Sequence, residues 1–203
     1  MAFRRLLHIV RPFFSIAFST SSICRCRSVS GDGYHYRRDG GFRIVLSERY
    51  HGGSARDPKI VKAADGYHMF VTTSLMKGTL AGRGCLAHLL SEDGRGWRET
   101  EPIYVSPDES QPECPDYFAK DGWHYLVFSH HGHGQYRYSR LPFSEWQTPA
   151  DPEIPCESVP KAAIWRGRII FAGFHRMEGY GGTLTFTEAW QEDNGVLRFR
   201  EGL

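Results

Sequence analysis

Three stretches of the chain, residues 57–74, 114–131 and 159–176, share one pattern of apolar and polar positions. Each starts at or beside a proline, continues as a short apolar run, breaks at a two-residue step and returns as a second apolar and aromatic run. The steps are Asp65-Gly66, Asp121-Gly122 and Arg166-Gly167. Because glycine readily takes the positive φ angles of tight turns, each stretch is predicted to be a β-hairpin.

A more polar pair of short strands is predicted after each hairpin, in residues 84–99, 135–147 and 182–199. Trp97 and Trp146 close the first two of these pairs at matching places. Four strands per unit, recurring about every 45 to 57 residues, indicate propeller blades rather than a sandwich or an α/β sheet. Since three blades do not close a ring, the chain either pairs with something else or is part of a larger propeller.

Composition supports an all-β class. The 203 residues include 22 Gly and 11 Pro, and 14% are aromatic, a combination that favours short strands joined by tight turns. Lys and Arg (25) nearly balance Asp and Glu (23), so no field of one sign suggests nucleic acid or an anionic membrane as partner. A neutral, sugar-like ligand suits this balance. Five cysteines without paired Cys-x-x-Cys spacing signal neither a zinc site nor a complete disulfide framework.

The N-terminal segment differs from the rest of the chain. Residues 1–30 contain no Asp or Glu, several Arg and many Ser, which is typical of a targeting leader. Its apolar part, residues 6–18, is interrupted by Arg11 and Pro12 and is too short to span a bilayer. We expect residues 1–41 to be a disordered leader or unrelated segment, and residues 42–203 to form the blades. A cleaved presequence, a poor signal peptide and unrelated sequence stay open, as do a cytoplasmic and a secreted location and the oligomeric state.

Two acids stand at the heads of predicted inner strands, the strands that line the central channel of a propeller. Asp57 directly precedes Pro58, and Glu113 stands two positions before Pro115. The third head has no acid next to its proline, although Glu157 lies just upstream. We therefore expect the chemistry of this chain at the first two heads.

The motifs Arg56-Asp57-Pro58 and Glu113-Cys114-Pro115-Asp116, in this order and in register with the repeat, resemble glycoside hydrolase family 32, the β-fructosidases. The resemblance covers residues 42–203 and implies part of a five-bladed β-propeller. It further implies that Asp57 stabilises the transition state, that Glu113 is the general acid/base, and that a β-fructoside such as sucrose or a short fructan is the substrate. Arg56 and Cys114 are the expected substrate-binding neighbours.

The third acid of that family, the nucleophile, has no counterpart here. The family carries it in an Asn-Asp-Pro-Asn-Gly-type motif on the first blade, and nothing in residues 1–55 matches. Asp32 and Asp39 lack the flanking Asn and Pro. Retaining hydrolysis needs this second carboxylate, so the isolated chain could be inactive. The alternatives are a non-catalytic propeller remnant with weak carbohydrate binding, and a related five-bladed arabinofuranosidase or mannoside phosphorylase.

One further cluster, His130, His131 and His133, lies in a Gly-rich turn with no matching carboxylate in the sequence around it. We expect a solvated or sugar-lining loop there and no metal site. No organic cofactor is implied either, because glycoside hydrolysis needs only carboxylates and water. The aromatic side chains of the predicted strands are expected to form the core of the sheets.

Overall fold

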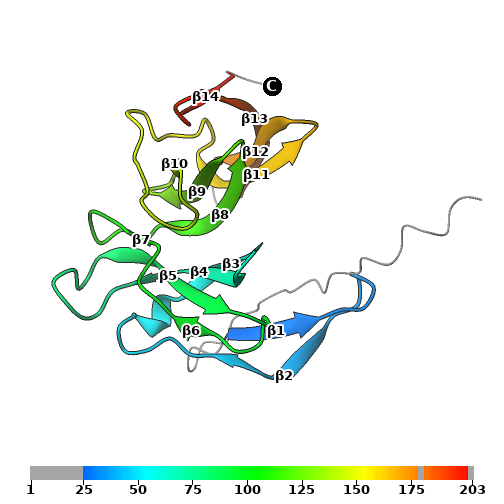
Figure 1. The fold of residues 1–203 in the computed structure, drawn as a ribbon, viewed down its shortest axis with the longest axis vertical. Helices are drawn as coiled ribbons and strands as arrows, with labels where there is room; N and C mark the ends of the chain where they lie inside the picture. Colours follow the sequence, from blue (N-terminus) through cyan, green and yellow to red (C-terminus); the bar gives the residue numbers. More distant parts are fainter. Residues whose placement is uncertain (1–24, 178–180, 201–203) are drawn as a thin grey trace, which may run out of the picture.

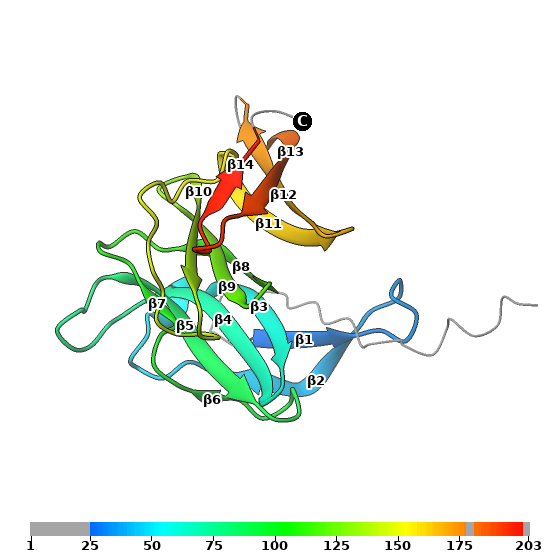
Figure 2. The ribbon, with the colours of Figure 1, turned by 45° about the horizontal axis from the view of Figure 1, so that its top comes forward.

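The computed structural model describes residues 25–177 and 181–200, whose regular elements are strands and one 3-10 helix, η1 (Gly52–Ser54). Three antiparallel sheets follow one another in chain order, preceded by a smaller two-stranded sheet (Figure 1 and Figure 2). The predicted all-β fold with about three propeller blades is confirmed. In this part of the chain, no helix is long and apolar enough to cross a membrane.

The first blade consists of β3 (Arg56–Ala63), β4 (Gly66–Ser74), β5 (Gly84–Ser91), β6 (Arg98–Glu99) and β7 (Tyr104–Val105). The second consists of β8 (Glu113–Lys120), β9 (Trp123–His130) and β10 (His133–Ser139). The third consists of β11 (Ser158–Trp165), β12 (Arg168–Arg176), β13 (Gly182–Gln191) and β14 (Leu197–Phe199). Only isolated bridges to Gln147 and Glu153 take the place of a fourth strand in the second blade. Four prolines between residues 142 and 155 explain this, since proline cannot donate a ladder hydrogen bond.

The hairpin turns match the prediction in the second and third blades. Asp121 and Gly122 both have positive φ angles, as do Arg166 and Gly167, which is the geometry of type I′ turns. The first hairpin turns one residue earlier than predicted, because Ala63 pairs with Gly66. Gly66 instead begins β4, where a Cβ atom would stand 2.5 Å from a main-chain oxygen of β5. A glycine is therefore needed at this position because β4 and β5 approach each other closely.

Alternate side chains of each strand enter different cores between the blades. Tyr125 and Val127 of β9 pack with side chains of the third blade, whereas Leu126 and Phe128 pack with side chains of the first. This period of two follows from the pleat of a strand. A middle blade therefore has both of its faces covered by apolar neighbours.

The outer face of the first blade is covered by the N-terminal sheet of β1 (Arg25–Val29) and β2 (Arg37–Ile44). Phe42 and Ile44, which alternate with exposed positions in β2, pack against the apolar side chains of β4 and β5. The corresponding face of the third blade is open, and Leu184 of that face is 63% exposed.

The ordered N-terminal sheet differs from the predicted disorder of residues 1–41. Residues 25–41 belong to a hairpin-like pair of strands, and the expected boundary before Phe42 falls inside β2. The Nε atom of Arg27 donates to Asp39 at 3.0 Å, and the same guanidinium lies over the Phe42 ring. These contacts hold the two strands of the hairpin together. The polar composition of the segment gave no indication of strands in the sequence. Residues 1–24 lie outside the described residues, so a leader there stays a prediction.

Candidate functional site

The same backbone irregularity begins all three inner strands. β3, β8 and β11 lie beside one another, and the pairing register of each shifts around its proline, between Arg56 and Lys59, between Glu113 and Asp116, and between Ser158 and Lys161. Such a shift is a β-bulge, which re-aims the side chains next to it.

The residue before each proline has a left-handed backbone. The φ angles are 50° at Asp57, 52° at Cys114 and 52° at Val159. A non-glycine residue pays about 1–2 kcal/mol for this conformation, which the surrounding sheet must offset. Asp57 is thus equivalent to Cys114, while Glu113 is equivalent to Arg56. The two acids therefore come from adjacent blades but do not occupy equivalent positions, because Asp57 directly precedes its proline and Glu113 stands two residues before its own.

Arg56 joins the two acids. Its Nη2 atom forms an ion pair with Oε1 of Glu113, and its Nε atom lies 3.6 Å from Oδ2 of Asp57. The guanidinium is held from behind, because Nη1 donates to the main-chain oxygen of Ser54 at 3.0 Å and to the side-chain oxygen of Gln111. The structure therefore brings Asp57, Glu113 and Arg56 together at the heads of β3 and β8.

Cys114 contacts Asp57 through its backbone. The Cys114 amide donates to Oδ2 of Asp57 at 3.3 Å, and its Sγ atom lies 3.5 Å from the same oxygen. Burial, with the negative charge of Asp57 as the next cause, raises the pKa of the Cys114 thiol to about 11. The thiol is therefore protonated at neutral pH and is a poor nucleophile. Substrate binding by Cys114 stays a prediction.

A layer of alternating charge supports this arrangement, and the sequence analysis missed it. Lys59, Asp116 and Lys161 occupy the equivalent position directly after each proline. The Lys59 ammonium lies 2.5 Å from Oδ1 of Asp116, whose other oxygen accepts from the amide of Ala162 at 2.8 Å. Lys161 donates to the main-chain oxygens of Cys114 and Pro115. These contacts hold the three inner strands together one to three residues after the acids of β3 and β8.

A hollow of about 840 Å³ opens beside Glu113, at the heads of β8 and β11, and extends onto the open face of the third blade. Glu113 and Cys114 form one wall, and Phe174, Leu184 and Arg176 are among the side chains of the other. A mixed apolar and polar wall of this kind suits a sugar ring, which has both apolar faces and hydroxyl groups. Glu157, the remaining acid of the third head, accepts a hydrogen bond from the backbone of Arg176.

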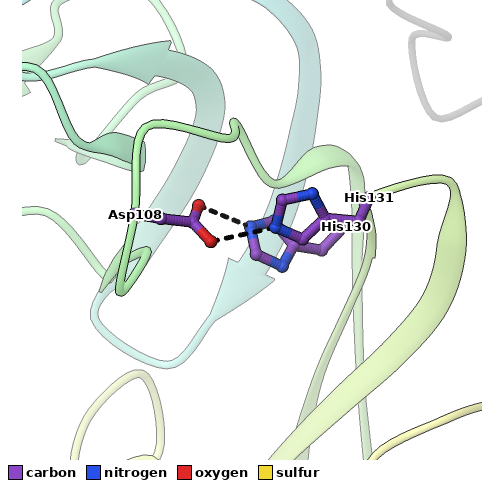
Figure 3. A group of neighbouring side chains, drawn as sticks. All are labelled: Asp108, His130 and His131. Carbon is purple, nitrogen blue, oxygen red and sulfur yellow. Dashed lines mark hydrogen bonds and ion pairs between the residues drawn. The ribbon is translucent and has the colours of Figure 1, made fainter.

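The other acids and histidines of the sequence analysis lie elsewhere. Asp32 is engaged with His35 within the N-terminal hairpin. The histidine-rich turn does meet a carboxylate, contrary to the expectation, because Asp108 reaches it from the segment between β7 and β8 (Figure 3). Sequence separation hid this partner, which only the packing of two blades brings near.

Comparisons with known proteins agree with the resemblance of the motifs. No family profile matches the sequence. The chain is 28% identical over 209 residues to sucrose-6-phosphate hydrolase of Escherichia coli, an alignment that covers 85% of this chain and 41% of the relative.

Two solved structures share the fold. Fructan 1-exohydrolase IIa of Cichorium intybus superposes with a TM-score of 0.70 at 13% identity, over 93% of this chain and 44% of its own. The family 32 β-fructofuranosidase BmSUC1 of Bombyx mori gives 0.67 at 16% identity, over 93% and 47%. Structures of single-residue variants of these two proteins hold 1-kestose and sucrose, respectively. The chain spans less than half the length of these relatives. In its motifs, its sequence and its fold, the chain is similar to the glycoside hydrolase family 32 β-fructosidases, and it corresponds to part of a propeller of that kind.

Proposed function

We propose that this chain carries the acid/base half of a β-fructosidase site, which acts on the O-glycosidic bonds of β-fructosides such as sucrose and short fructans. In this proposal Glu113 is the general acid/base and Asp57 stabilises the transition state. The observation that supports it best is that both carboxyl groups, from adjacent blades, lie against the guanidinium of Arg56.

Asp57 is placed to act on a positively charged sugar ring. Its carboxyl group faces the Arg56 guanidinium and accepts a hydrogen bond from the Cys114 amide, and these contacts fix its position. An ionised carboxylate beside the fructosyl ring would stabilise the positive charge that develops on the ring as the glycosidic bond breaks.

Glu113 is more accessible, with its side chain 47% exposed at the wall of the hollow. Its Oε1 atom is occupied by the ion pair with Arg56. Proton donation to a leaving oxygen therefore requires this ion pair to loosen. A sugar hydroxyl that accepts hydrogen bonds from Arg56 would release Glu113 in that way.

A second candidate function is carbohydrate binding without hydrolysis. Retaining hydrolysis needs a nucleophilic carboxylate about 5 Å from the acid. In the part of the chain that the structure describes, the ion pairs of Arg56 are with Asp57 and Glu113, and the nearby Asp116 is engaged by Lys59. The hollow beside Glu113 could still accept a sugar.

Sugar release from sucrose and from a short fructan tests the proposal on the full chain. We compare the wild type with Glu113→Gln and Asp57→Asn, and use Glu109→Gln as the matched control, because Glu109 is an exposed acid of the segment that leads to β8. Turnover that both site variants abolish, and that the control keeps, is the expected result.

Calorimetry with fructose and sucrose separates the two candidates. Binding that Glu113→Gln weakens, in the absence of any turnover, favours the binding function over hydrolysis. Turnover that survives in Glu113→Gln overturns its catalytic role. A wild type that neither binds nor hydrolyses these sugars, while an arabinoside or a mannoside is turned over, overturns the assignment to β-fructosides.

A further inference from the structure

Asp108, His130 and His131 converge where the end of β9 meets the segment between β7 and β8 (Figure 3). His130 is the last residue of β9, and His131 is the first residue of the tight turn to β10. Neighbouring side chains of a regular strand point to opposite faces. Here the left-handed backbone of His131, with a φ of 51°, breaks the alternation, and both rings reach the same carboxylate.

Two of the distances between the three groups are close to the edge of a metal coordination polyhedron. Nε2 of His131 lies 2.9 Å from Oδ2 of Asp108, and Nε2 of His130 lies 3.4 Å from Oδ1. One ligand atom from each residue lies within 4.8 Å of the others. In a tetrahedral zinc site with bonds of about 2.0–2.1 Å, neighbouring ligands are roughly 3.3 Å apart. Small side-chain rotations would therefore suffice to close the three ligands around one ion.

Neighbouring groups already orient two of the ligands. The side chain of His130 is only 6% exposed, and its ring packs edge-on against Phe128. The Ser106 hydroxyl donates to Oδ1 of Asp108 at 3.0 Å and, with its hydrogen so placed, accepts from Nε2 of His130 at 2.9 Å; an ion bound at this nitrogen would replace that proton. The third ligand, His131, is 59% exposed. One side of the cluster is thus anchored and the other open, which leaves room for an ion to enter with water as its fourth ligand.

We propose that Asp108, His130 and His131 form a binding site for a divalent transition-metal ion, of which Zn²⁺ fits best. Two imidazole nitrogens and one carboxylate oxygen are a donor set that zinc favours, whereas Ca²⁺ and Mg²⁺ prefer oxygen ligands alone. The ion would fasten the segment between β7 and β8 to the β9–β10 hairpin. Because that segment leads to Glu113, the site would also steady the head of β8, whether or not the chain hydrolyses sugars.

Zinc titration of the full chain, without a polyhistidine tag and after treatment with a chelator, tests this proposal. The variant is His131→Asn, since asparagine tolerates a left-handed backbone and the side chain is exposed. The matched control is His133→Asn, on the same hairpin, because His133 contacts Glu153 outside the cluster. We expect one zinc ion per chain with an affinity that falls at least about tenfold in His131→Asn and in Asp108→Asn, and stays unchanged in the control.

Cysteine thiols elsewhere in the chain also bind zinc, so the comparison between His131→Asn and His133→Asn decides the outcome. A second readout is the visible spectrum of the Co²⁺-loaded chain. A site of two histidines and a carboxylate gives tetrahedral cobalt bands without the charge-transfer band of a thiolate. Equal zinc affinity in the two asparagine variants, or a thiolate band that persists in His131→Asn at unchanged intensity, would overturn the proposal.

Discussion

His88 should make the stability of this protein depend on pH. It lies in β5, buried between blades, where its Nε2 atom is 2.9 Å from Nδ1 of His68. The other nitrogen of His68 contacts Asp65 at 3.0 Å. Burial is the main cause that lowers the pKa of His88 from 6.5 to about 4. Positive charge on His68, and to a smaller extent on Arg98, lowers this pKa further, whereas the negative charge of Asp65 raises it. In the folded protein this imidazole therefore stays neutral in mildly acidic solution.

The sign and size of the effect follow from proton linkage. Below pH 6.5 the unfolded chain binds a proton at His88 that the folded chain binds only near pH 4. Its contribution to stability is complete above pH 6.5 and is lost as the pH falls towards 4. A shift of this size corresponds to a loss of about 2 kcal/mol between pH 7.5 and pH 5, and of about 3 kcal/mol by pH 4.

Urea unfolding at a series of pH values measures this loss. Other buried histidines and the carboxylates also titrate, so the wild type is compared with His88→Gln, which keeps an amide donor for His68 and does not titrate. The variant is expected to be less stable at pH 7.5 through lost packing, but to lose about 2 kcal/mol less than the wild type between pH 7.5 and pH 5. Parallel stability curves for the two proteins would refute the reasoning.

Three shorter predictions test the fold and the site. Leu126→Ala, between two blades, should cost about 3–5 kcal/mol in urea unfolding, and Leu184→Ala on the open face less than about 1 kcal/mol; similar losses would mean that this face is covered in solution. Gly66→Ala should lower the melting temperature markedly, since its Cβ would meet a main-chain oxygen; an unchanged melting temperature would contradict the close approach. Alkylation of Cys114, followed by mass spectrometry, should accelerate only as the pH approaches 11, and earlier in Asp57→Asn; rapid labelling at neutral pH would disprove the effect of burial.

Local signals predicted most of the fold. Apolar runs around Asp121-Gly122 and Arg166-Gly167 identify hairpins because turn chemistry and strand periodicity act over few residues. The N-terminal sheet could not be predicted in this way. Only two apolar side chains of β2, Phe42 and Ile44, enter the core, and the rest of the hairpin depends on contacts such as the one between Arg27 and Asp39. Such long-range pairs have no periodic signature.

The supporting residues of the site were hidden for a related reason. The sequence shows a charged residue after each of three prolines, namely Lys59, Asp116 and Lys161. Their opposite charges attract one another only because the three inner strands lie side by side in the fold. Asp108 likewise meets His131 only because two blades pack together. Motif resemblance located the acids, whereas the contacts that hold them are made in three dimensions.

Charge balance around Arg56 explains why this half-site can persist. Two carboxylates from adjacent strands repel each other at short range, and a single guanidinium between Asp57 and Glu113 offsets that repulsion. A third carboxylate beside them would add negative charge that the Arg56 guanidinium alone would not offset. The acid role proposed for Glu113 therefore depends on a group that draws the Arg56 guanidinium away from it, such as a further carboxylate at the heads of the inner strands or a hydroxyl of the substrate.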